Sequence, residues 1–375
     1  MQLCRNAEQA YNMKLIAGSG GMENTVRWVH MVEDSEVPGF LHGNELVFTT
    51  GIGHFGSDWL SNFVKSLKEH NAAGVVLNLG PYITTVPPYV IVYCEENNFP
   101  LFTIPWQVHI IDITYSFCRR IIENEEQETS LAESFRNLIF APENRRGYAE
   151  TLERLGFHEN SVYTILAVNI GGSKSAAEQL RKNDNSLWRL LKHSRSAAAM
   201  FYQDGNLIAV RQQVSNDEMR RLLSELSKSQ YDTDFNIGIS ESGSGYSMVA
   251  KCYNQAVSAL SVAKVRNERL VHYKDIGVYK LLFGVENREI INSYVDGILG
   301  DIIRYDNMNG TDYENTLRIY LKCSGSVQQT SAILNVHRNT INYKIKVIRE
   351  ITGMKLNDED KMNLLLAFRA KDIFM

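Results

Sequence analysis

Residues 316–349 (TLRIYLKCSGSVQQTSAILNVHRNTINYKIKVIR) constrain the fold more than any other part of this 375-residue chain. The Ser-Gly-Ser triplet at 324–326 ends one helix and supplies a cap for the next. A short helix is predicted over residues 327–334, and Asn335 then stands where a tight turn between two helices needs a left-handed backbone. A longer helix is predicted to begin near His337. Together these signals predict a helix–turn–helix.

The second predicted helix has two chemically distinct faces. At about 100° per residue, Ile341, Ile345 and Ile348 fall within about 60° of one another, and a polar set fills a separate arc of about 100°. That set is Arg338, Asn339, Asn342, Lys346 and Arg349. Residues 337–349 hold four lysines and arginines and no acid, although the whole chain has a net charge of −4. The positive charge is therefore local, so this segment is where a nucleic acid would bind.

The polar face has the chemistry that a DNA duplex requires. Arginine pairs with guanine, and asparagine with adenine, in the major groove. Lysine, threonine and tyrosine suit phosphate oxygens, and the first residues of the second helix reach the base edges. We expect base reading by His337, Arg338, Asn339 and Asn342, and backbone contacts by Thr340, Tyr343, Lys346 and Arg349. The alternative, an ordinary solvated helix face, is disfavoured by the turn chemistry that precedes the helix.

The same run closely resembles the C-terminal helix–turn–helix of PucR-type transcriptional regulators. The hallmark of that family is an HRNT core, then an aromatic and a basic residue, and later a TG turn. The matching positions here are 337–340, Tyr343-Lys344 and Thr352-Gly353. Ser331 stands where the family usually has alanine, which is equally small. The resemblance implies sequence-specific binding to double-stranded DNA.

The resemblance extends over nearly the whole chain. Residues 24–51 (NTVRWVHMVEDSEVPGFLHGNELVFTTG) resemble the family's N-terminal domain, and the middle of the chain is similar to the degenerate GGDEF-like module found between the two. The resemblance implies an N-terminal sensor domain, a non-catalytic central domain and a DNA-binding C-terminal domain. It also implies regulation by a small metabolite, with purine catabolism suggested by the family name.

Periodicity in the rest of the chain agrees with this organisation. Strands are predicted at 26–32, 45–50, 74–79 and 101–104, and helices at 59–70 and 88–97. Strands are also predicted at 162–170 and 235–239, a hairpin at 200–210 turned by Asp204-Gly205, and helices at 186–198, 216–228 and 245–265. After residue 280 only helix signals remain, interrupted by turns at 308–311, 324–326, 352–353 and 357–358.

The fold class that follows is multidomain. It combines an α/β N-terminal domain, an α/β GGDEF-like central domain and an all-α helix–turn–helix domain. The predicted boundaries are 1–110 for the sensor, 111–158 for connecting helices, 159–278 for the central domain and 279–375 for the DNA-binding domain. Residues 110–140 read as one long helix that either pairs with its copy in a homodimer or packs only on its own domain. No sustained heptad decides between the two.

The central domain also raises an enzyme hypothesis, because active GGDEF domains make a cyclic dinucleotide. That chemistry needs carboxylates to hold Mg²⁺ against triphosphates. The first strand here carries Asn169 where an active relative has a metal-binding aspartate, so we expect no catalysis, no catalytic residues and no cofactor. The loop at 171–175 (GGSKS) lacks the spacing of a phosphate-binding loop. A ligand-binding adaptor without DNA binding is a third hypothesis, and the basic face opposes it.

The N-terminal segment carries polar residues suited to a metabolite pocket. Such pockets are mostly apolar with a few convergent polar groups. The candidate ligand-binding residues are Arg27, His30, Glu33, Glu45, Thr49 and Thr50. Structural hydrogen bonding is the alternative role for the same side chains. A metal site is not expected, because the spacing of His30, His42 and His54 matches no helix-based ligand pair.

Composition limits the cellular setting. The five cysteines are widely spaced without any C-x-x-C pair, which argues against a disulfide framework and against a thiolate zinc site. No apolar run approaches the roughly 18 residues that a bilayer requires. The first residues do not form a signal peptide, so we expect a cytoplasmic protein. A single helix–turn–helix reads few bases, so we also expect a homodimer, or a dimer of dimers, on an inverted-repeat operator.

Overall fold

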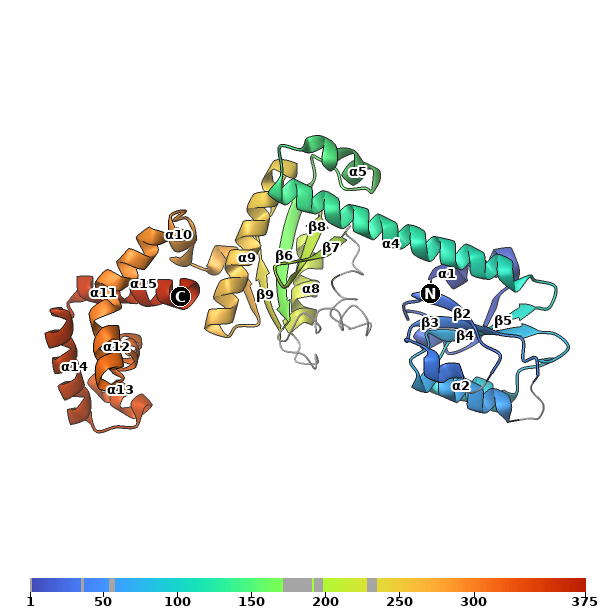
Figure 1. Cartoon of the computed structure of the whole chain (residues 1–375), viewed down its shortest axis with the longest axis horizontal. Coiled ribbons are helices and arrows are strands. Elements are labelled where there is room, and N and C mark those ends of the chain that lie inside the picture. The colour runs from blue at the N-terminus through green and yellow to red at the C-terminus, as the bar shows by residue number, and fades with distance from the viewer. Residues whose placement is uncertain (1, 35–36, 54–57, 171–190, 192–197, 228–234) are drawn as a thin grey trace. The chain divides into compact units, whose positions relative to one another are not determined.

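The computed structural model describes residues 2–34, 37–53, 58–170, 191, 198–227 and 235–375 (Figure 1). The described residues form two units, one ending at Glu133 and one beginning at Ser134. They are called unit 1 and unit 2. Within these ranges no helix is both long enough and apolar enough to cross a membrane.

Unit 1 is built on a five-stranded sheet in the order β1-β5-β4-β3-β2. The strands are β1 (Lys14–Ala17), β2 (Trp28–Met31), β3 (Glu45–Thr49), β4 (Gly74–Leu79) and β5 (Leu101–Pro105). Strands β2 to β5 run parallel, and β1 is antiparallel to β5. Strand β1 has no counterpart in the prediction, because its four residues are too few to show a period.

Helices cover both faces of this sheet (Figure 1). Helices α2 (Trp59–Glu69) and α3 (Pro88–Glu96) lie on one face, and each connects two successive parallel strands. Helix α1 (Gln2–Tyr11) and the first turns of α4 (Ile110–Phe140) lie on the other. The apolar stripe predicted for α2 is its buried face, formed by Leu60, Phe63, Val64 and Leu67. Strand β4 is buried on both faces, as its continuous apolar run predicts.

Glu33 fastens the carboxyl ends of β2 and β3 to each other. Its carboxylate accepts hydrogen bonds from the Thr49 hydroxyl at 2.9 Å, the Thr50 amide at 2.8 Å and the Thr50 hydroxyl at 2.8 Å. The Gly51 amide donates to it at 2.9 Å. Bonds of this kind to an ionised acceptor are stronger than neutral ones. The bend after β3 therefore depends on this one carboxylate.

Unit 2 begins with the last turns of α4 and a second sheet. Its strand order is β11-β9-β6-β8-β7, with β10 paired to β6. The strands are β6 (Val162–Ile170), β7 (Ala198–Gln203), β8 (Asn206–Gln212), β9 (Phe235–Ile239), β10 (Gly243–Ser244) and β11 (Leu270–His272). The predicted hairpin turn is confirmed, because Asp204 and Gly205 both have positive φ, 49° and 76°. The predicted helix at 186–198 and the loop at 171–175 lie almost wholly outside the described residues.

The end of α4 is buried in unit 2. Phe135 is fully buried and packs edge-on against Phe157 with ring centroids 5.1 Å apart, and a second edge contact joins it to Tyr163. Helix α5 (Ala149–Arg154) follows, and α8 (Asn216–Ser227) and α9 (Val249–Arg266) complete the central part. Helix α9 packs on β6 and β9. Short 3₁₀ helices lie at Ser19–Gly21, Val37–Phe40, Arg145–Gly147, Tyr246–Met248 and Tyr273–Asp275.

The last hundred residues are helical, as predicted. The helices are α10 (Tyr279–Phe283), α11 (Arg288–Asn309), α12 (Tyr313–Lys322), α13 (Val327–Leu334), α14 (Arg338–Thr352) and α15 (Asp358–Phe374). The expected turns are present: Gly310 and Gly353 are left-handed caps, and Asn357 forms a capping box with Asp360. These helices share one hydrophobic core with α9, to which Ala259, Val262 and Ala263 contribute.

We predict that Glu33→Ala destabilises the protein by about 3 kcal/mol, because it leaves the buried Thr49 hydroxyl and two backbone amides without their acceptor. The matched control is Glu96→Ala, which removes an exposed glutamate at the end of α3. Urea unfolding of both variants measures the difference. Equal stability of the two variants would show that the bend does not depend on Glu33.

Candidate DNA-binding surface

Helices α13 and α14 form the predicted helix–turn–helix. Ser326 caps α13 by accepting a hydrogen bond from the Gln329 amide, and the buried Thr330 hydroxyl donates to the Ser326 carbonyl at 2.7 Å. Asn335 ends the helix with φ of 54° and ψ of 43°, the predicted left-handed conformation. The Val336 amide then donates to the Ser331 carbonyl at 3.1 Å, which closes the turn.

Three isoleucines of α14 anchor it to the domain. Ile341 and Ile348 are completely buried and Ile345 is 6% exposed. They join a core that includes Leu317, Tyr320 and Leu321 of α12. The face predicted to be apolar is therefore the buried one, and it fixes the rotation of α14 about its axis.

All eight residues predicted to contact DNA have exposed side chains. They are His337, Arg338, Asn339, Thr340, Asn342, Tyr343, Lys346 and Arg349. Tyr343 is 63% exposed, which leaves its hydroxyl free of the core. The structure thus places these side chains on the solvent side of α14, and their contacts with DNA stay a prediction.

His337 has a local role that sequence reasoning missed. It is the N-cap residue of α14, and its Nδ1 accepts a hydrogen bond from the Asn339 amide at 3.2 Å. Capping residues satisfy amides that have no partner inside the helix. Only Nε2 of this ring is then left to face a ligand.

Lys344 faces the interior of the domain. Its ammonium bonds to the carboxylate of Asp312 and to the Thr316 hydroxyl, and it lies 6.0 Å from the centre of the Tyr313 ring. Burial raises the pKa of Tyr313, so that hydroxyl stays neutral beside the ammonium. Lys344 is one of the four basic residues between positions 337 and 349. It joins α14 to α12, whereas the other three remain on the outer face of α14.

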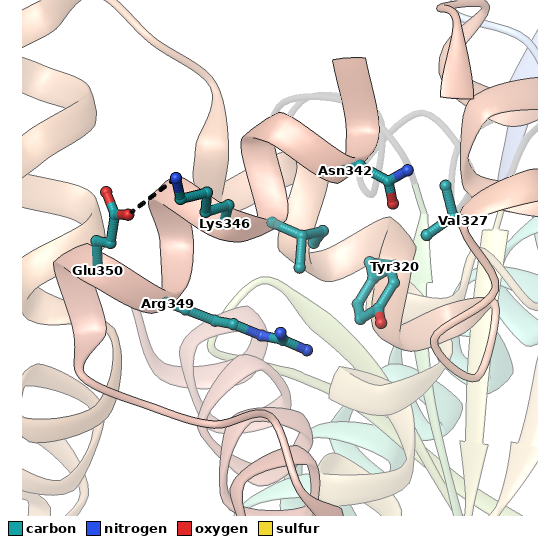
Figure 2. Close-up of a pocket in the computed structure, with 7 residues that line it drawn as sticks. Tyr320, Val327, Asn342, Lys346, Arg349 and Glu350 are labelled. Carbon is teal, nitrogen blue, oxygen red and sulfur yellow. Dashed lines mark ion pairs between the residues drawn. The ribbon is translucent and has the colours of Figure 1, made fainter. Parts of the chain in front are cut away.

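A groove lies along one side of α14, where this helix meets α12 and the start of α13 (Figure 2). It is lined by Tyr320, Val327, Asn342, Ile345, Lys346, Arg349 and Glu350. Arg349 extends along it, and the Lys346 ammonium lies 3.9 Å from the Glu350 carboxylate. Such a long, exposed ion pair is weak. Lys346 can therefore leave Glu350 for a phosphate at little cost.

The six candidate ligand-binding residues of unit 1 do not form one cluster. Glu33, Thr49 and Thr50 meet at the carboxyl end of β3, where they bond to one another. Glu45 begins β3, about 13 Å away along the strand. Arg27 lies near Glu45, because its amide bonds to the Asn44 carbonyl, and His30 is exposed on the edge strand β2.

Glu45 has the more unusual environment of the two glutamates. It is 6% exposed, and its Oε1 accepts a hydrogen bond from the His42 amide at 2.8 Å. Its Oε2 is buried without a hydrogen-bond partner among the described residues. A buried carboxylate oxygen that lacks a donor is costly, and a ligand or a structural change can relieve that cost. Glu33, in contrast, already has its donors.

The central sheet offers amides where an active GGDEF domain has carboxylates. Asn169 of β6 donates from Nδ2 to Oδ1 of Asn206, at the start of β8, over 3.0 Å. The strand end and the hairpin therefore meet through two neutral side chains. In the part of the chain that the structure describes, no three acidic, histidine or cysteine side chains are grouped to hold a metal. All five cysteines are free thiols.

The fold and the surface of α14 define a multidomain helix–turn–helix protein, and comparison with protein families agrees. Residues 2–121 match the purine catabolism regulatory protein-like family, residues 142–262 a GGDEF-like domain, and residues 313–370 the PucR C-terminal helix–turn–helix domain. The three matches follow one another in the predicted order. The chain belongs to the PucR family.

Its relatives are named as regulators and not as enzymes. The proline-responsive transcriptional activator PutR of Bacillus subtilis is 25% identical over 67% of this chain and 63% of its own length. The purine catabolism regulatory protein of Bacillus subtilis is 28% identical over 32% of this chain and 23% of its own length. The carbohydrate diacid regulator of Escherichia coli is 25% identical over 67% of this chain and 68% of its own length. The chain thus spans less than two thirds of the length of the first two relatives.

The capping role of His337 predicts a specific substitution pattern. His337→Ala should lower the free energy of unfolding by about 1 kcal/mol, because the Asn339 amide loses its acceptor, whereas His337→Asn should restore it. Urea unfolding of the two variants measures the difference. If the alanine and asparagine variants unfold alike, the side chain of residue 337 does not cap α14.

Proposed function

We propose that this chain is a sequence-specific DNA-binding transcriptional regulator whose activity a small metabolite controls. The observation that carries the proposal is the exposed polar face of α14, held outward by three buried isoleucines after a helix–turn–helix turn. Membership of the PucR family and the regulatory names of the relatives support it. Neither of the other hypotheses, a nucleotide-processing enzyme or an adaptor without DNA binding, has an observation of this kind in its favour.

Arg338, Asn339 and Asn342 are proposed to read bases, and His337 to add a contact through Nε2. Thr340, Tyr343, Lys346 and Arg349 are proposed to hold phosphates. Sequencing the DNA fragments that the purified protein retains would give the operator. Because a homodimer presents two copies of α14, we propose an operator that is an inverted repeat with half-sites about one helical turn apart, or a multiple of it.

Two lysines of α14 provide a matched test of this surface. Lys346→Gln should weaken binding to all sequences and reduce the salt slope by about one, because an outward phosphate contact is lost. Lys344→Gln removes the same charge two residues away and should leave the slope unchanged, because Lys344 bonds to Asp312.

Arg338→Ala should cost about 1–3 kcal/mol of DNA-binding free energy and relax base preference at one position. Fluorescence anisotropy on operator DNA at several salt concentrations measures all three.

Two outcomes would contradict this assignment. Equal salt slopes for the two lysine variants would show that Lys344 and Lys346 contribute equally to DNA binding, although one side chain faces inward and the other outward. Wild-type affinity in both Arg338→Ala and Lys346→Gln would place the DNA contact elsewhere on the chain.

Unit 1 is proposed to hold the effector, a small nitrogen-containing metabolite. Glu45 carries this proposal, because its buried Oε2 lacks a donor among the described residues and an N–H group of a ligand would supply one. Two relatives are named for proline and for purine catabolism, so these compound classes, which carry N–H groups, form the first panel to test. A ligand alters DNA affinity only by binding two states of the regulator with different affinity.

Calorimetry on the full-length protein tests the effector proposal. We expect one of the purines, their breakdown products or proline to bind, Glu45→Gln to abolish that binding, and Glu96→Gln to leave it unchanged. Hydrogen exchange with the bound compound should show protection in residues 24–51. Protection confined to residues 161–273 would refute the proposal and place the sensor in the central domain.

A further inference from the structure

Helix α4 has two separate apolar faces in unit 1. One face, with Ile113, Phe117 and Ile121, is buried against the sheet and joins a core with Phe48 and Val76. This packing confirms that α4 is anchored on its own domain. It does not account for the apolar residues on the other side of the helix.

The second face is a stripe of four residues that remains accessible. Ile111 is 74% exposed, Tyr115 is 69% exposed and Ile122 is 43% exposed. Cys118 lies between them; it is partly exposed and also packs against the core of unit 1. At about 100° per residue the four fall within about 60° of one another, roughly 130° from the buried face. They are called the α4 stripe.

The spacing of the α4 stripe is that of a coiled-coil seam. Its members follow one another at intervals of four, three and four residues, which keeps them in line on one face of α4 and lets a second helix pack along them. A second copy of α4 presents the same stripe, so the two stripes can cover each other along their whole length.

We propose that the α4 stripe is a dimer interface, and that it pairs antiparallel with the α4 stripe of a second copy of this chain. The proposal rests on the homodimer of the proposed function and names the surface that forms it. In this pairing Ile111 meets Ile122 of the second copy, and Tyr115 meets its Cys118. A thiol beside an aromatic ring is a favourable contact.

Charges beside the stripe favour the antiparallel direction. The next seam position after Ile122 is Glu125, and a parallel pair would place two of these carboxylates against each other. In the antiparallel pair Glu125 instead lies beyond the partner's Ile111, near the amino end of its α4, where the helix dipole attracts a negative charge. Asp112 and Arg119 lie on one flank of the seam, so each Asp112 also approaches the partner's Arg119, which pairs with Glu123 of its own helix.

The native cysteines allow a direct test. Burial raises the pKa of Cys4 and Cys94 to about 12 and also raises that of Cys252, and Cys323 is buried, so Cys118 is the thiol open to reagents. In the antiparallel pair the two Cys118 residues are offset by about 4.5 Å along the axis. A bismaleimide with an ethylene spacer should therefore link two full-length chains, and Cys118→Ser should abolish the link.

Engineered disulfides fix the direction. In a Cys118→Ser background, the double variant Ile111→Cys, Ile122→Cys should form a covalent dimer on mild oxidation, whereas Ile122→Cys alone should not. A covalent dimer of Ile122→Cys alone would overturn the antiparallel arrangement, because only parallel helices place residue 122 opposite itself.

A charge substitution tests the interface without cross-linking. Tyr115→Glu should weaken self-association at least about tenfold in sedimentation equilibrium, since it places two carboxylates in the seam. Gln127→Glu adds the same charge to an exposed position of α4 away from the stripe and should have no effect. Circular dichroism checks that both variants remain folded.

Two results would overturn the proposal. The first is a dimer in which Cys118 does not cross-link and in which Tyr115→Glu leaves the association constant unchanged. Such a dimer uses another surface. A chain that stays monomeric, free and on DNA, would refute the homodimer as well. The salt-slope test of Lys346 is independent of both, so DNA binding and dimerisation can fail separately.

Discussion

Burial of Ile341, Ile345 and Ile348 determines what α14 can do. Each buried isoleucine contributes about 1.5–3 kcal/mol, so rotating the helix to hide its polar face instead would cost several times that amount. The same packing decides which charges are available. Lys346 and Arg349 remain outside, whereas Lys344 is turned toward α12 and pairs with Asp312. The functional surface is thus a consequence of the core beneath it.

Helix α4 connects two units that are otherwise separate cores. Its first turns are buried through Ile113 and Phe117 in unit 1, and its last turns through Phe135 in unit 2. The acidic middle, residues 123–128, is exposed or partly exposed and supplies no core contacts. The α4 stripe that we propose as a dimer interface lies on this same helix.

The N-terminal domain shows how a parallel sheet separates residues that are close in sequence. Glu33 and Glu45 are twelve positions apart, and each lies at an opposite end of β3. One carboxylate is fully used in holding the bend after β3, and the other keeps a buried oxygen without a donor in the described structure. Residue type alone makes these two glutamates equivalent, and only their surroundings distinguish a structural carboxylate from a candidate binding group.

The sequence by itself determined the elements whose signal is local. The turn at Asn335, the two faces of α14 and the extent of α4 follow from periodicity and capping, because those interactions involve residues a few positions apart. Tertiary structure alone decided the pairing of β1 with β5, the cap formed by His337, the environments of Glu33 and Glu45, and the exposure of the α4 stripe. These features depend on which distant segments of the chain pack against a side chain, and a short stretch of sequence does not contain that information.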